Sequence, residues 1–72
     1  MRSDKRVIYP RLEHEMAKQG LNRYQVGQIA GIESDVGLGN RFRGTTPFQL
    51  SEMMLLSNHL GVPMTELFEK GE

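Results

Sequence analysis

Residues 20–32, GLNRYQVGQIAGI, have the features of one short helix with a glycine near each end. Asn22 is a favoured N-cap residue, and Gln25, three positions later, can return a hydrogen bond to it in a capping box. Gly31 follows Ala30, and a glycine in this place commonly adopts the left-handed conformation that ends a helix. The stretch therefore predicts a helix that begins after Asn22 and ends at Ala30.

The segments on either side carry helix signals of the same kind. Pro10 suits the first position of a helix and Gly20 supplies a stop, so a first helix is expected between them. On the C-terminal side, Thr46 is expected to cap another helix, with Pro47 in its first position and Gln49 completing a capping box.

The helix expected after Thr46 has apolar residues at helical spacing as far as Leu60, and Gly61 follows as its stop. Residues 63–70, PMTELFEK, predict a last short helix. No stretch alternates convincingly between apolar and polar residues, so no sheet is expected. The predicted fold class is all-α, a compact bundle of about five short helices.

The stretch GIESDVGLGNRFRG, which starts at Gly31, is harder to assign because it contains four glycines. Leu38 and Phe42 are four positions apart, so a helix over residues 34–42 would place both on its buried side. Gly37 and Gly39 inside that helix would each cost about 1 kcal/mol relative to alanine. Close approach of a neighbouring helix or of a nucleic-acid backbone would explain them. A loop anchored by the two apolar residues is the alternative.

Composition narrows the class of protein. The chain has 72 residues, no cysteine and a formal net charge of zero. That length allows one small core, and the lack of cysteine excludes a disulfide framework and a thiolate zinc site. No apolar run approaches the roughly 20 residues of a membrane span, so a cytoplasmic protein is expected. Residues 1–45 contain eight Lys or Arg and five Asp or Glu, whereas residues 46–72 contain one Lys or Arg and four Asp or Glu. One side of the folded domain could therefore be basic.

The chain contains GLNRYQVGQIAGI, then FRG, then LLSNHLGVPMTELF. In this order the three stretches resemble the lambda-repressor-like helix-turn-helix family (XRE-type, Cro-like), and the resemblance extends from about Leu12 to Phe68. It implies a domain over residues 8–70 with its helix-turn-helix at about 22–43. It also implies a phage-like transcriptional regulator that binds double-stranded DNA as a homodimer and represses by occupying an operator, without a cofactor.

In that family the third helix enters the major groove and the second lies across the phosphates. With Leu38 and Phe42 on the buried side, Ser34 and Arg41 are expected on the exposed arc. Arginine pairs well with guanine, and asparagine with adenine. The residues expected to contact DNA are Arg23, Ser34, Asn40, Arg41, Arg43, Thr45, and Lys5 and Arg6 of a flexible basic arm at residues 1–7.

Two further features leave alternatives open. The apolar residues Met64, Leu67 and Phe68 suit the dimer contact that the last helix often makes in this family, or they close the small core. Glu33 and Asp35 occupy the front of the third helix, where the family usually has polar or basic residues. We expect both acids to interact with the helix dipole in its first turn, although they also repel phosphates.

These acids, together with the zero net charge, favour one alternative function: a protein-interaction module that keeps the fold but has lost DNA binding. An enzyme is not expected. His14 and His59 are the only histidines, and His14 lacks the second histidine of a zinc-protease motif. The glycine-containing stretch has no Gly-Lys-Ser/Thr, so it does not match a phosphate-binding P-loop.

Overall fold

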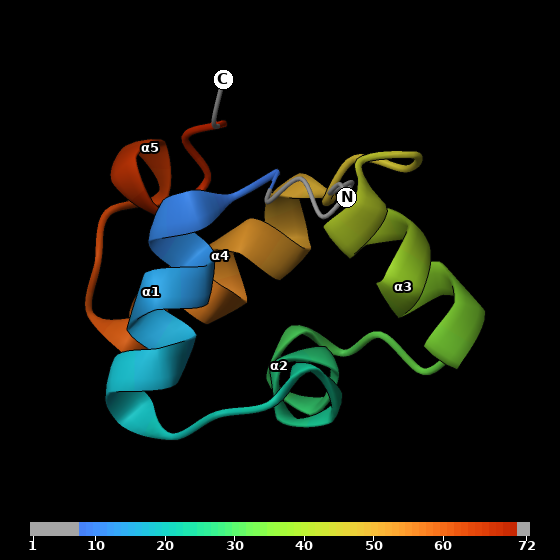
Figure 1. The fold of residues 1–72 in the computed structure, drawn as a ribbon, viewed down its shortest axis with the longest axis horizontal. Coiled ribbons are helices and arrows are strands. Elements are labelled where there is room, and N and C mark those ends of the chain that lie inside the picture. The colour runs from blue at the N-terminus through green and yellow to red at the C-terminus, as the bar shows by residue number, and fades with distance from the viewer. Residues whose placement is uncertain (1–7, 71–72) are drawn as a thin grey trace, which may run out of the picture.

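The computed structural model describes residues 8–70, which fold into a bundle of helices (Figure 1). In chain order these are α1 (Pro10–Gln19), α2 (Arg23–Ala30), α3 (Asp35–Arg43), α4 (Leu50–Leu60) and α5 (Met64–Leu67). No strand occurs in this part of the chain, so the all-α prediction is confirmed. None of the described helices has the length and apolarity needed to cross a membrane. The basic arm predicted at residues 1–7, including Lys5 and Arg6, lies outside the described residues.

The helix boundaries follow local signals in the sequence. At the start of α2 the Asn22 side chain accepts from the Gln25 N–H at 2.8 Å, and the Asn22 N–H donates to Gln25 Oε1 at 2.9 Å. The predicted capping box is therefore confirmed. A glycine in the left-handed conformation, with φ between 68° and 85°, ends each of the first four helices: Gly20, Gly31, Gly44 and Gly61.

The start of α4 was predicted wrongly. The helix begins at Leu50, and its N-cap is Gln49 rather than Thr46. The Gln49 N–H donates to Oε1 of Glu52 at 2.9 Å, so the capping partner lies three positions after Gln49 and not before it. A carboxylate accepts a hydrogen bond more strongly than a hydroxyl, which favours this later start. The preceding loop instead buries Phe48 in the core.

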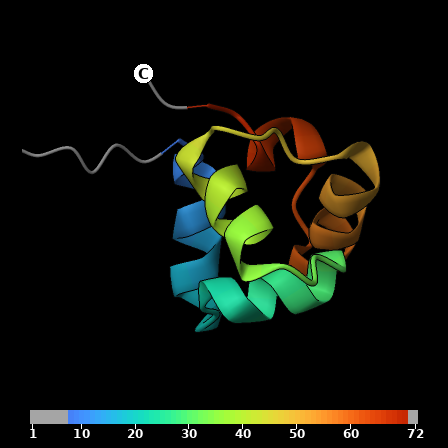
Figure 2. The same ribbon diagram turned by 90° about the vertical axis from the view of Figure 1, so that its right-hand side faces the viewer.

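The core takes side chains from every helix. Four of them are fully buried, one each from α1, α2, α4 and α5: Leu12, Val26, Leu56 and Leu67. From α3, Leu38 and Phe42 are buried as predicted. In the bundle α5 packs on α1 and α4, while α2 packs on α4 and α3. Figure 2 views the molecule from the α3 side, with α2 running beneath α3.

Aromatic rings cover the end of the core that lies near the first and last described residues. Tyr9 meets the rings of Phe48 and Phe68 edge-on, with centroids 5.4 Å and 5.7 Å apart. Phe48 also contacts Phe42 edge-on at 5.8 Å and Phe68 in a tilted arrangement at 5.0 Å. Such pairs add about 0.5–1.5 kcal/mol each beyond the area they bury. The cluster joins the end of α3 to the C-terminal segment.

The glycines of α2 and α3 have different roles from those expected. A Cβ on Gly27 would lie only 2.9 Å from Cδ2 of Leu38, so α2 and α3 approach closely at Gly27. The atoms nearest to a Cβ on Gly37 come from Arg41 and Ser34, and those nearest to a Cβ on Gly39 come from Arg43. These two glycines therefore make room for side chains of their own segment, and no neighbouring helix fills that space.

Candidate nucleic-acid interface

The helix predicted over residues 34–42 is α3, displaced by one residue at each end. Ser34 is its N-cap, and the Ser34 hydroxyl accepts from the Gly37 N–H at 3.1 Å. Ser34 is exposed, as predicted, but its hydroxyl oxygen is used to start the helix. Asp35 lies in the first turn, where a carboxylate interacts favourably with the helix dipole. Glu33 precedes the cap, so the first-turn position predicted for it was wrong.

The outer face of α3 is formed by residues on the side opposite Leu38 and Phe42. Val36 is 71% exposed, a large value for an apolar side chain. Asn40 is half-buried, and its Oδ1 accepts from Nη2 of the exposed Arg43 at 2.5 Å. Val36 was not among the predicted contacts. The 100° turn per residue, counted from Leu38 and Phe42, would have placed it outward.

Arg41 does not lie on the exposed arc, contrary to the prediction. Its side chain is only 12% exposed, because its guanidinium pairs with Glu52 of α4. Nε donates to Oε1 at 2.8 Å and Nη2 donates to Oε2 at 3.0 Å, while Nη1 donates to the Gly37 carbonyl at 2.9 Å. A two-point pair of this kind fixes the orientation of both groups. Arg41 thus fastens α3 to α4.

Arg23, at the start of α2, keeps 56% of its side chain exposed but already has two partners. Its Nη2 donates to Glu13 of α1 at 3.4 Å, and its guanidinium carbon lies 4.6 Å from the centre of the Phe42 ring. An exposed ion pair contributes only about 0–1 kcal/mol, so a phosphate could compete with Glu13 for this guanidinium.

Arg43 is the arginine of α3 that remains open to solvent. Among residues 8–70 no carboxylate lies within 4.0 Å of it. The exposed Thr45 follows, and its N–H donates to the Asn40 carbonyl at 2.9 Å. A Cβ on Gly44 would lie 3.3 Å from the Ile8 side chain. The described chain therefore starts beside the C-terminal end of α3.

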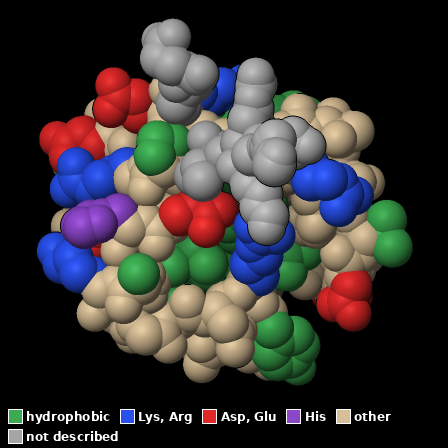
Figure 3. Space-filling model, in the orientation of Figure 1, with side chains coloured by type: hydrophobic (Ala, Val, Ile, Leu, Met, Phe, Trp, Pro, Cys, Tyr) green, Lys and Arg blue, Asp and Glu red, His purple; other side chains and the backbone are tan. Residues whose placement is uncertain are grey.

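The charges on the view in Figure 3 are mixed in sign, with blue and red side chains interspersed and no continuous basic surface. Pairing explains part of this pattern, because Arg11 and Lys18 both form ion pairs with Glu15 of their own helix.

The side chains predicted for a dimer contact at the C-terminal end are buried or half-buried within the chain. Leu67 is fully buried and Phe68 belongs to the aromatic cluster, while Met64 is half-buried. The alternative considered with it, closure of the small core, describes Leu67 and Phe68. Among the described residues, the large apolar side chains that are exposed lie elsewhere: Tyr24, Val36, Leu50, Met54 and Leu55.

No protein-family model, curated protein or solved structure matches this chain.

Proposed function

We propose that the chain binds double-stranded DNA through the outer face of α3 and regulates transcription by occupying an operator. The observation that carries this proposal is the composition of that face. Asn40 can pair with adenine, Arg43 with guanine or a phosphate, and the exposed Val36 can contact a thymine methyl group. Leu38 and Phe42 anchor the opposite side of the helix in the core, so the outer face is held rigidly.

The described chain begins beside the same end of α3. Ile8 packs beside Gly44, and Arg6 precedes it by two residues. Helix α3 would then place Asn40 and Arg43 at base edges, with Arg23 and the basic segment at phosphates. Arg41 has a positioning role in this arrangement.

Replacing Arg43 with alanine should weaken binding to the preferred duplex by about 1–3 kcal/mol. The slope of log affinity against log salt concentration should fall by about 0.9 if Arg43 contacts a phosphate. Fluorescence anisotropy at about 50 and 200 mM salt, on a duplex selected from random sequences, measures both quantities. Lys18→Ala is the control, because α1 and α3 lie on opposite sides of the molecule in Figure 1. Absence of binding at the lower salt concentration would rule out the proposal and favour the protein-interaction module.

For the homodimer, we propose contact through the outer face of α4, formed by Leu50, Ser51, Met54, Leu55 and Asn58. These side chains are exposed and carry no charge. A second copy meets no like charge on such a face, and an antiparallel arrangement also pairs the helix dipoles favourably. Eleven helical residues are only about 16 Å long, so we expect the contact to bury less than the roughly 1,000 Å² of a stable interface. The dimer should therefore be weak without DNA.

Sedimentation equilibrium should show an average mass that rises with protein concentration towards about 1 mM, the range of a weak contact. Met54→Lys should abolish that rise, because it places two like charges across the contact. Thr65→Lys introduces the same charge at an exposed position of α5 and should leave the rise unchanged. A strictly monomeric wild-type chain at every concentration would exclude this interface.

A further inference from the structure

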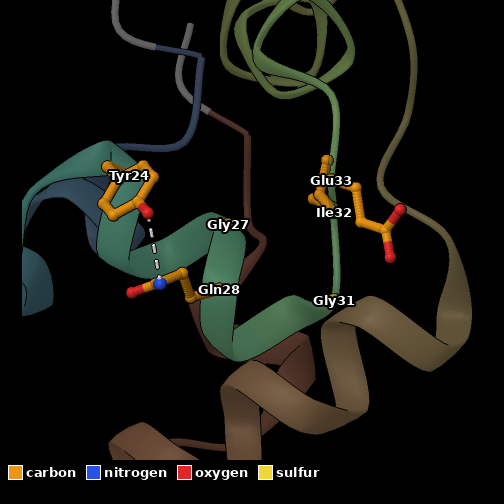
Figure 4. Close-up of a pocket in the computed structure, with 6 residues that line it drawn as sticks. All are labelled: Tyr24, Gly27, Gln28, Gly31, Ile32 and Glu33. Atoms are coloured by element: carbon orange, nitrogen blue, oxygen red, sulfur yellow. Dashed lines mark hydrogen bonds between the residues drawn. The ribbon is translucent and has the colours of Figure 1, made fainter.

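A hollow of about 440 Å³ opens on the surface beside the turn that joins α2 to α3. Its lining consists of Tyr24, Gly27, Gln28, Gly31, Ile32 and Glu33. In Figure 4, Tyr24 and Gln28 extend from α2, Ile32 and Glu33 lie on the turn, and bare glycine backbone separates the two sides. None of these six residues belongs to the face proposed for DNA.

Two of the lining residues are glycines, each for a separate reason. At Gly27 a Cβ would collide with Leu38, as described above. Gly31 has φ of 80°, a conformation that side chains rarely adopt, and the space around its Cα is open. The floor is therefore fixed by the packing of α3 on α2 and by the turn itself. It does not depend on a movable side chain.

The polar groups around the hollow suit a cation. Glu33 carries the one charged side chain in the lining, and it is negative. Gly31 ends α2, and the C-terminal end of a helix bears partial negative charge. The Gln28 amide nitrogen donates to the Tyr24 hydroxyl at 3.4 Å, so its carbonyl oxygen is left as an acceptor. A phosphate would meet repulsion from the first two of these groups.

Tyr24 adds a surface that recognises cations in another way. Its side chain is 63% exposed, and ammonium or guanidinium groups are attracted to the face of an aromatic ring. The Glu33 carboxylate points away from Tyr24 in Figure 4. Glu33 is exposed, so rotation about its own side-chain bonds can bring the carboxylate to a cation over the hollow.

We propose that this hollow binds an arginine or lysine side chain in an extended basic segment of a partner protein. The volume holds one long side chain, and the neighbouring acid Asp35 would attract further basic residues of the same segment. The hollow adjoins the N-terminal end of α3, whereas Asn40 and Arg43 lie towards its C-terminal end. Binding of a basic segment at the hollow therefore does not depend on DNA binding by α3.

An NMR titration of the ¹⁵N-labelled chain with N-acetyl-arginine N-methylamide tests this site without DNA. Saturable shifts are expected at the amides of Gly31, Ile32 and Glu33, with half-saturation in the millimolar range typical of a single side chain, about 1–10 mM. Glu33→Gln should weaken binding by about fivefold, the effect of one exposed charge pair. Asp35→Asn is the matched control, because it removes one exposed charge outside the lining and should change affinity by less than about twofold.

Three results would overturn the site. The amides could show no saturable shift up to about 50 mM probe, well above the affinity expected. Equal losses in Glu33→Gln and Asp35→Asn would show general attraction to an acidic surface, and the same shifts with methyl phosphate would show that the hollow does not select a cation. Tighter binding of spermidine than of the arginine probe would assign the hollow to a free polyamine and contradict a protein partner. A failed DNA titration would leave all of these measurements unaffected.

Discussion

Glu52→Ala should lower the free energy of unfolding by about 3 kcal/mol, because it leaves the Arg41 guanidinium enclosed without its counter-charge. The Glu52 and Arg41 side chains are 10% and 12% exposed, so water compensates poorly for the loss. The substitution also removes the acceptor for the Gln49 N–H at the start of α4. Urea denaturation followed by circular dichroism measures the change, with the slope m showing whether unfolding remains a single transition.

Two variants separate the charge from the rest of the side chain. Glu52→Gln keeps an oxygen that can accept from the Gln49 N–H, so it should lose less than Glu52→Ala does. Glu13→Ala breaks the exposed pair with Arg23 and should cost less than about 1 kcal/mol. Equal losses of stability in Glu13→Ala and Glu52→Ala would show that the Arg41–Glu52 pair stabilises the fold no more than the exposed Arg23–Glu13 pair does. The prediction would then be wrong.

Most of the helix boundaries could be predicted from the sequence because their signals are local. The Asn22–Gln25 capping box and the glycine after each of α1 to α4 lie within a few residues of the boundary that they set. The start of α4 was mispredicted because two capping signals overlap. Gln49 can complete a box with Thr46 before it or open one with Glu52 after it, and only the structure shows that Glu52 also holds Arg41.

The candidate site was less predictable because the partners of its arginines come from other helices. The spacing of Leu38 and Phe42 gave the buried side of α3 correctly. It could not show that Glu52, eleven residues after Arg41, comes near enough to draw that arginine inward. Nor could it show that Glu13 partners Arg23. A helical pattern gives the direction of a side chain, whereas the charge that it meets depends on tertiary packing.

Leu67→Ala should lower the free energy of unfolding by about 3 kcal/mol, within the range for a buried leucine truncated to alanine. Leu67 is fully buried between the helices that α5 contacts, α1 and α4, so its loss leaves a cavity in the core. The same urea experiment at two protein concentrations, tenfold apart, measures the effect and its dependence on self-association. Val36→Ala, an apolar truncation at an exposed site of α3 outside the proposed dimer contact, should change stability by less than about 0.5 kcal/mol at both concentrations.

The concentration dependence distinguishes a core residue from a dimer contact. If Leu67 stabilises the core alone, the loss is the same at both concentrations, because folding of one chain involves no second copy. A residue in a dimer contact would affect the concentrated sample more, since only there are folding and association linked. A loss confined to the concentrated sample would restore the C-terminal dimer contact inferred from sequence. A constant loss would leave the outer face of α4 as the apolar surface available to a second copy.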